Sequence, residues 1–309
     1  MNTSPPRRLA AEFDQGQVPS IACVNMATAD LGVDWKQLIA ALDEYANAVF
    51  APVWGTPAKI IDAGKGPAIP SGHWGILFLD DADSPGALGY HDLTPDGLPL
   101  SKVFVRTTLA DGQKVSVTAA HELAEMLVDP GIQMGAIGPD GQTWYAYEMS
   151  DAVEREEFTV NGIAMSNFVY PAWFEAFRAP GSVKFDHLGT CTRPFELRPG
   201  GYMPVFRNGS WTQIFGSREA AERFNTASHP RMRARPHRMR LNQIREAQRQ
   251  LRDLGFYRGQ IDGIDDPQTK QALAAYQKKY GPRDHDHTVT PGLAAALFAK
   301  IWWPGGTGN

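Results

Sequence analysis

The sequence VTAAHELAEMLVDPG, residues 117–131, predicts a helix that carries ionisable groups in an apolar setting. Leu123 and Leu127 recur at helical spacing and give the segment an apolar face. His121 and Glu125 are four residues apart, so their side chains lie one above the other on one side of the helix. Two interpretations stay open at this point. The segment is half of a metal site, or it is a half-exposed helix whose charged groups are solvated.

Strand and helix patterns alternate before this helix. Residues 34–50 have the spacing of a helix with one apolar face, and Asp34 is its predicted N-cap. Apolar runs of strand length occur at residues 20–27, 58–63, 73–83, 86–93 and 102–108. We therefore expect a mixed α/β domain in which the helix at residues 117–131 follows several strands.

The segments after the helix are shorter and richer in turns. We expect hairpins at residues 157–165 and 201–216, the second turning at Asn208-Gly209, and a short helix at residues 171–177. From residue 231 to residue 252 eight arginines accompany one glutamate. A solvated basic connector is the favoured interpretation of this run, and a patch for an anionic polymer is the alternative.

Length, charge and cysteine content limit the classes of protein. The chain has 309 residues, a net charge of −4 and two distant cysteines, Cys23 and Cys191. This length favours two domains, the charge argues against nucleic acid as a partner, and the cysteines do not suit a disulfide framework. No apolar run long enough for a secretion signal or a membrane span occurs, so we expect synthesis in the cytoplasm and no membrane partner.

A compact motif occupies the C-terminal region. Leu251 and Leu254 have helical spacing, and Gly255 follows as a helix-ending residue. The string LGFYRGQIDG, residues 254–263, together with Gln248 resembles the peptidoglycan-binding domain type 1. The resemblance implies an all-α three-helix bundle over residues 238–303 that binds peptidoglycan through Tyr257, Asp262 and Tyr276.

The predicted organisation has five parts. They are a flexible tail at 1–16, an α/β (α+β) domain at 17–216, a basic linker at 217–237, the small bundle at 238–303 and a tail at 304–309.

The segment HELAE differs at one position from the zinc-protease signature His-Glu-x-x-His. In that signature the two histidines bind the metal and the glutamate is the general base. Glu125 stands here in place of the second histidine, and WYAYEMSDAVE, residues 144–154, offers Glu148 and Asp151 downstream. HELAEMLVDP, YEMSD and NFVYPAWF together resemble a divergent zincin-like metallopeptidase family over residues 19–175.

This resemblance implies a metal site on the helix of a zincin-like domain with a mixed sheet. The cofactor is one divalent metal, Zn²⁺, and its implied ligands are His121, Glu125 and Glu148. Glu122 is the implied general base, and Asp151 and Asp129 are implied to hold the ligands in place. Tyr147 is the predicted oxyanion-stabilising residue, with three alternatives: Tyr90, His91 and Tyr170. Convergent carboxylates in a partly dry site also favour a cation without reference to any family.

Two functions follow as expectations. The first is a metal-dependent peptidase, a hydrolase of amide bonds, that a peptidoglycan-binding module holds at the bacterial cell wall or its peptides. The second is a non-catalytic peptidoglycan-binding component of a phage or phage-like particle, in which the zincin scaffold is degenerate. The missing secretion signal favours arrival at the wall by lysis or by delivery in such a particle.

Overall fold

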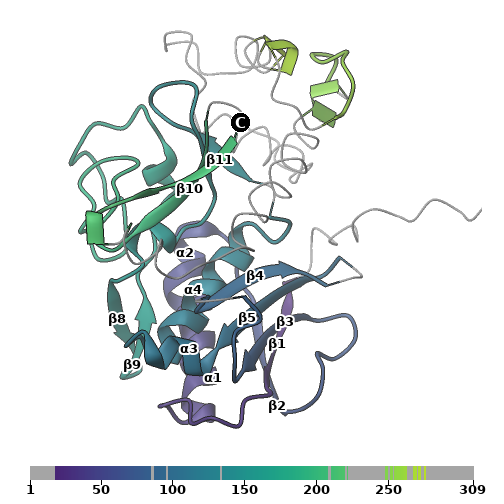
Figure 1. Ribbon diagram of the computed structural model, residues 1–309, viewed down its shortest axis with the longest axis vertical. Helices are drawn as coiled ribbons and strands as arrows, with labels where there is room; N and C mark the ends of the chain where they lie inside the picture. The colour runs from purple at the N-terminus through teal and green to yellow at the C-terminus, as the bar shows by residue number, and fades with distance from the viewer. Residues whose placement is uncertain are drawn as a thin grey trace, which may run out of the picture.

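The computed structural model describes most of the chain from residue 18 to residue 221 and short pieces near the C-terminus (Figure 1). The described residues are 18–84, 87–94, 97–132, 134–207, 210–219, 221, 248–249, 251–252, 254–262, 267–269, 271–272 and 275.

A five-stranded sheet organises the first part of the chain (Figure 1). Its strands, in the spatial order β2-β1-β3-β5-β4, are β1 (Ser20–Asn25), β2 (Lys59–Lys65), β3 (Trp74–Leu79), β4 (Gly89–Leu93) and β5 (Pro99–Phe104). The first four in this order are parallel, and the edge strand β4 runs antiparallel to β5. The predicted mixed α/β class is therefore confirmed.

The first helical segment contains three consecutive elements. They are α1 (Trp35–Glu44), the π-helical turn η1 (Tyr45–Phe50) and α2 (Ala51–Trp54). Asp34 accepts a hydrogen bond from the backbone N–H of Gln37, as predicted for an N-cap. Gly55, with a φ of 74°, ends the segment in a left-handed conformation that glycine adopts without strain.

Helix α4 (Val115–Val128) lies in the interior of the domain. It follows the short helix α3 (Val105–Ala110) and packs against β4, β5, η1 and strand β9 (Ile163–Ser166), so it lies between the large sheet and the later segments (Figure 1). Every residue of α4 is buried, including His121, Glu122 and Glu125. The interpretation of residues 117–131 as a half-exposed helix is therefore wrong, because protein covers every side of this helix.

Two smaller sheets follow α4. One has the order β11-β10-β7-β6 and contains β6 (Gly135–Ile137), β7 (Trp144–Ala146), β10 (Tyr202–Arg207) and β11 (Ser210–Phe215). The other pairs β8 (Glu157–Val160) with β9. Two 3₁₀ turns, η2 (Asp151–Val153) and η3 (Pro171–Phe174), connect these strands. Both predicted hairpins are confirmed, although Asn208-Gly209 lies outside the described residues.

The predicted bounds of some elements differ from the observed ones. The strand predicted at residues 102–108 ends at Phe104, and the β-branched residues beyond it begin α3. Packing of this segment in the folded protein overrides the intrinsic strand preference of valine and threonine. The helix predicted at residues 171–177 is only η3, and the short strands β6 and β7 were not predicted.

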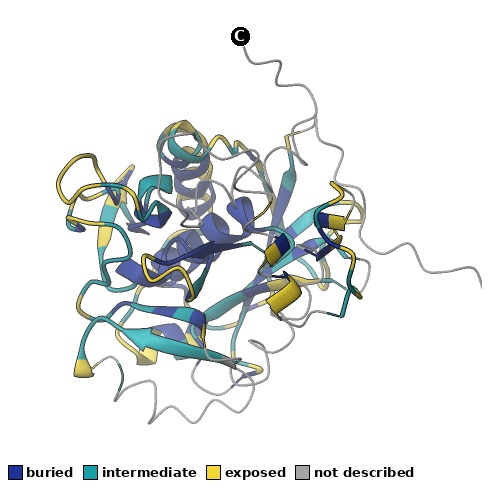
Figure 2. Ribbon diagram, turned by 90° about the horizontal axis from the view of Figure 1, so that it is seen from above, coloured by how far each residue is buried: buried dark blue, intermediate teal, exposed yellow. Residues whose placement is uncertain are grey.

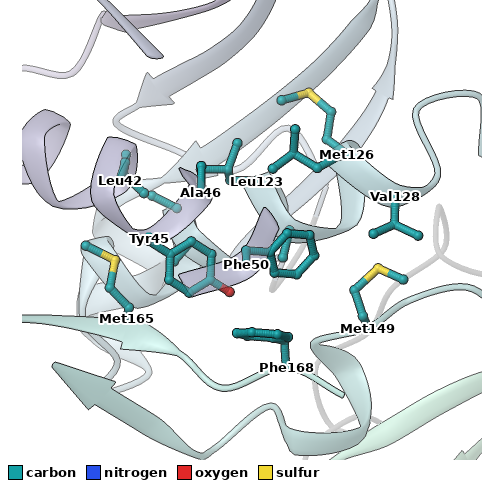
Figure 3. Packing of buried hydrophobic residues seen from close by; sticks show 14 of the residues in the cluster. Leu42, Tyr45, Ala46, Phe50, Leu123, Met126, Val128, Met149, Met165 and Phe168 are labelled. Atoms are coloured by element: carbon teal, nitrogen blue, oxygen red, sulfur yellow. The ribbon is translucent and has the colours of Figure 1, made fainter. Parts of the chain in front are cut away.

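Aromatic side chains fill the core beneath α4 (Figure 3). The ring centroid of Phe168 lies 4.7 Å from that of Phe50 and 5.8 Å from that of Tyr45, and all three residues are fully buried. Figure 2 shows that buried residues gather in the interior and that exposed ones gather in the peripheral turns. This packing holds η1 and the segment after β9 against one side of α4.

The described part of the C-terminal region is small. Leu251, Tyr257 and Ala272 form a cluster with Ile137 of β6, and Trp144 and Phe256 pack against it. Most of the predicted three-helix bundle and of the linker at 217–237 lies outside the described residues, so the predicted domain boundaries stay predictions. In the part of the chain that the structure describes, no helix is long and apolar enough to cross a membrane.

We expect Phe168→Ala to lower the free energy of unfolding by about 3–5 kcal/mol, because it leaves a cavity in a packed aromatic core. Phe177→Ala is the matched control, since this side chain is 46% exposed and its loss should change the free energy by no more than about 0.5 kcal/mol. Urea unfolding followed by fluorescence measures both values. Equal losses for the two variants would contradict the packing described here.

Candidate metal centre

Helix α4 brings three ionisable side chains into the interior. His121 and Glu125 share one side of the helix because they are four residues apart, and Glu122 follows His121 directly. No described lysine or arginine forms an ion pair with any of the three carboxyl or imidazole groups. The surrounding elements must therefore supply the groups that balance them.

The two ring nitrogens of His121 face different partners. Nδ1 lies 2.9 Å from Oε2 of Glu154. Nε2 lies 3.2 Å from Oε1 of Glu125 and 3.2 Å from Oδ1 of Asp151. Metal-binding histidines characteristically give their other ring N–H to a carboxylate, which fixes the tautomer and the orientation of the ring. Glu154 stands in that position, so Nε2 is aimed at the two remaining carboxylates.

Strand β10 holds Asp151 in place. The phenol of Tyr202 hydrogen-bonds to the Asp151 side chain. The backbone N–H of Arg198 donates to the carbonyl oxygen of Ala152, and a Cβ on Gly201 would lie only 2.2 Å from that same oxygen. Glycine at this position is therefore required for the close approach of the β10 segment to η2.

The edge strand contributes a second histidine, His91. Its Nδ1 lies 3.5 Å from Oε2 of Glu125 and 3.8 Å from Oε2 of Glu122. On the other side of the ring, Nε2 lies 3.7 Å from Oε2 of Glu148. The imidazole therefore sits among three buried carboxylates.

Glu122 lies close to the backbone of the edge strand. A Cβ on Gly89 would stand 2.7 Å from Oε1 of Glu122 and 2.8 Å from the carbonyl oxygen of Lys102. The hydroxyl of Ser101, on β5, donates to the backbone carbonyl oxygen of Glu122 at 3.2 Å. These contacts fix the spacing between α4 and the sheet edge.

Two carboxylate oxygens of the site have no hydrogen-bond partner among the described residues. They are Oε2 of Glu122 and Oε2 of Glu148, and both residues are buried. Buried polar atoms are nearly always satisfied in native proteins, and an orphan atom often marks an ion or water position. Both oxygens face His91.

Burial and mutual repulsion change the protonation of these groups. Burial, and then the charge of Glu125, raise the pKa of Asp151 to about 8. Burial also raises the pKa of Glu122 and, together with the charge of Glu125, that of Glu148. For Glu125 itself burial opposes ionisation, but the charge of His121 and hydrogen bonds from both histidines hold its pKa below the usual range.

The histidines have the opposite shift. Burial acts to lower the pKa of His91 and of His121, yet the nearby carboxylates outweigh it and raise both pKa values well above 6.5. Without a cation, the cluster therefore retains protons at neutral pH to limit its negative charge.

Two sets of three side chains lie close enough together to hold a metal ion, and they include two of the three predicted ligands, His121 and Glu125. Within each set, one ligand atom from each residue lies within 4.8 Å of the others, and the sets are His121-Glu125-Asp151 and His91-Glu122-Glu125. Glu148 is in neither set, so the geometry favours Asp151 beside His121 and Glu125 and places Glu148 behind His91. Glu148 as a ligand stays a prediction.

Two further predicted residues lie at the margin of the site. Asp129 accepts a hydrogen bond from the backbone N–H of Met134 and ends α4. The ring of Tyr147 stacks on Phe174 with a centroid distance of 4.2 Å and contacts the edge of Trp54. A role for Tyr147 at a reacting oxyanion stays a prediction.

Glu154 and Tyr202 were not among the residues predicted from the sequence, and His91 was predicted only as an oxyanion candidate. Glu154 could have been predicted, because it is three residues after Asp151 and therefore one helical turn away from it. His91 and Tyr202 carry no local signal, since each reaches the site from a strand distant in sequence.

The predicted peptidoglycan-binding residues have mixed positions. Tyr257 is buried, and its hydroxyl donates to the carbonyl oxygen of Gln260. The side-chain amide of Gln248 donates to Asp262 at 3.0 Å and to the Tyr257 hydroxyl at 3.2 Å. These bonds give Tyr257 and Asp262 internal partners, and contact with a polymer stays a prediction. Tyr276 lies outside the described residues.

Residues 240–296 match the family model of the peptidoglycan-binding domain, which confirms that part of the sequence prediction. No curated protein and no solved structure matches the chain. The zincin-like resemblance of residues 19–175 therefore stays a prediction.

We expect the metal-free protein to lose stability as the pH rises from about 6.5 to about 8. His91, His121 and Asp151 all have folded-state pKa values above their ordinary ones, so the folded state binds more protons than the unfolded state in this range. Their stabilising contribution is present at lower pH and is lost as the pH passes through the raised values.

Differential scanning calorimetry in the presence of a chelator measures this trend, with an expected fall in Tm of about 2–4 °C or more. Saturating Zn²⁺ is the control, since a bound cation replaces the protons and should remove the fall. A Tm that stays level or rises between these pH values in the metal-free protein would contradict the assignment.

Proposed function

We propose that the domain at residues 17–216 is a metal-dependent amide hydrolase of the zincin-like type, held at the bacterial cell wall by the peptidoglycan-binding region. The observation that carries this proposal is the orientation of His121. Glu154 holds one nitrogen of the ring, and the other faces Glu125 and Asp151.

The donor set fits a divalent cation. Ligand atoms of a tetrahedral Zn²⁺ site with bonds of about 2.0 Å lie about 3.3 Å apart. Both separations from Nε2 of His121, to Glu125 and to Asp151, are 3.2 Å. A cation held there would polarise a scissile carbonyl group and make water more acidic.

Glu122 is the proposed proton acceptor in this reaction. It adjoins the ligand His121 on α4, and one of its oxygens is buried without a hydrogen-bond partner in the described part of the chain. Glu122 takes a proton from the attacking water and gives it to the departing amine. Burial raises the pKa of this carboxyl group, which brings it nearer to the value that suits such a transfer.

The ligand set predicts that a bound cation would activate water only weakly. One imidazole and two carboxylates would balance the two charges of Zn²⁺, whereas two imidazoles and one carboxylate leave one positive charge. Water should therefore be less acidified here than in a His-Glu-x-x-His protease. Carboxylate-rich sites also suit harder cations such as Mn²⁺, so slow turnover and a choice of metal are part of the proposal.

The match at residues 240–296 supports the proposed location. A wall-binding region joined to a hydrolase raises the local concentration of wall substrates around the site. Wall peptides and proteins near the wall are therefore the proposed substrates, and the routes to the wall are those of lysis or of delivery in a phage-like particle.

One observation fits a non-catalytic alternative equally well, in which the domain is a scaffold within a wall-binding component. All three ionisable residues of α4 are less than a tenth exposed, as expected for a structural cation site as well as for a narrow active site. The two functions can be distinguished by removing the Glu122 carboxylate, which should abolish activity only if the domain is a hydrolase.

We expect Glu122→Gln to reduce hydrolysis of wall peptides by about 10²–10⁴-fold, because the amide cannot accept the proton. Glu157→Gln is the matched control, since Glu157 is an exposed glutamate on β8 and its loss should leave the rate unchanged. Release of new amino groups from purified peptidoglycan measures the rate, and elemental analysis measures bound metal.

A metal-loaded wild-type protein that releases no amino groups from wall peptides or from unfolded protein substrates would reject the hydrolase and leave the scaffold function. A wild-type protein that binds no metal under saturating Zn²⁺ or Mn²⁺ would reject the metal centre itself.

We also expect the full chain to sediment with purified peptidoglycan and to remain in solution with chitin. Both polymers contain N-acetylglucosamine chains, so chitin controls for general retention on an insoluble sugar polymer. Equal sedimentation with both would show that the binding does not distinguish the wall polymer.

A further inference from the structure

We propose that a second divalent cation binds between His91, Glu122 and Glu125, so that the carboxylate of Glu125 bridges two cations. This inference concerns binding and stands apart from the proposed hydrolysis. Oε1 of Glu125 faces His121, whereas Oε2 faces His91, so the two oxygens already point to different histidines.

The distances around His91 suit the ligands of a shared cation. Nδ1 lies 3.5 Å from Oε2 of Glu125 and 3.8 Å from Oε2 of Glu122. Separations near 3.3 Å or slightly longer are those between neighbouring ligands of one metal ion. The three ligand atoms lie within 4.8 Å of one another.

An unsatisfied oxygen supplies an independent reason for a ligand. Oε2 of Glu122 is buried, faces His91 and has no hydrogen-bond partner among the described residues. A buried carboxylate oxygen without a partner is costly, and a cation placed against it removes that cost.

The charge balance of the whole cluster leaves room for more than one cation. Among the described ion pairs, the cationic partners in the cluster are two histidines, His91 and His121. Six acidic residues lie within or beside the cluster: Glu122, Glu125, Asp129, Glu148, Asp151 and Glu154. One divalent ion does not balance these carboxylates, so further cations or retained protons are needed.

The backbone around the second site is fixed before any ion arrives. His91 pairs with Ser101 across the antiparallel β4–β5 ladder, and the Ser101 hydroxyl donates to the carbonyl oxygen of Glu122. Gly89 allows the Glu122 carboxylate to lie against the strand. A preorganised site of this kind loses little conformational entropy on binding.

The second site has one nitrogen ligand and two carboxylate ligands, so it should take Mn²⁺ or Zn²⁺. A cation in this site would also compete for Glu122, the proposed proton acceptor. High metal concentrations should therefore inhibit the proposed hydrolysis, although the test of binding does not depend on any activity.

The test is the number of ions bound by the chelator-treated full chain after saturation with Zn²⁺ and removal of free metal. We expect two ions per chain for the wild type, one for His91→Ala and two for His73→Ala. His73 is the matched control, because it belongs to neither set of possible ligands and its Nδ1 makes an exposed contact with the Ser71 carbonyl oxygen.

A wild-type protein that binds one ion, lost in His121→Ala and kept in His91→Ala, would overturn the second site and leave the proposed function standing. A protein that binds no ion would overturn both. Two ions retained in a folded His91→Ala would also overturn the assignment to His91.

A measurement on the unaltered protein covers the case in which His91→Ala does not fold. Two Mn²⁺ ions bridged by one carboxylate interact magnetically, so the electron paramagnetic resonance spectrum of the Mn²⁺-saturated wild type should differ from the spectrum at one equivalent. A spectrum that only doubles in intensity, with the six lines of isolated Mn²⁺, would overturn the bridge.

Discussion

Burial of charge on α4 is the constraint on which the site depends. A helix covered on every side usually carries only apolar residues, and α4 carries His121, Glu122 and Glu125 within one turn and a half. An ionised carboxylate in such a place is stable only with close cationic or hydrogen-bonding partners. The elements around α4 therefore had to bring ionisable groups to it as well as apolar ones.

Each neighbouring segment meets this requirement differently. The large sheet brings His91 on its antiparallel edge, where a side chain can reach over the helix. The turn η2 brings Asp151, and the close approach of Gly201 lets Tyr202 hydrogen-bond to that aspartate. The aromatic core on the far side of α4 contributes no charge and fixes the helix against these partners. The contacts that hold the fold together therefore also hold the site together, since the loss of any of them would leave a buried charge without a partner.

Local pattern accounts for what could be predicted from the sequence. The N-cap at Asp34, the strands of the sheet and the helix with His121 and Glu125 all follow from periodicity and capping, which act within a few residues. The approach of His91 and Tyr202 depends on strand pairing and on packing between distant segments, which no local pattern records. The same limit applies to Glu148 and Asp151, which are three residues apart in a turn. Only the turn geometry shows which of them faces His121.

The single departure from the zinc-protease signature then has a physical meaning. A histidine has ring nitrogens on opposite sides, and the one that does not bind the metal usually donates its proton to a neighbouring carboxylate, as His121 does to Glu154 here. A second histidine at position 125 would therefore serve one cation. A carboxylate has two equivalent oxygens close together, and those of Glu125 face His121 and His91 separately. In the proposed two-ion centre, glutamate at this position would weaken the activation of water at one ion and would at the same time be a ligand for the other.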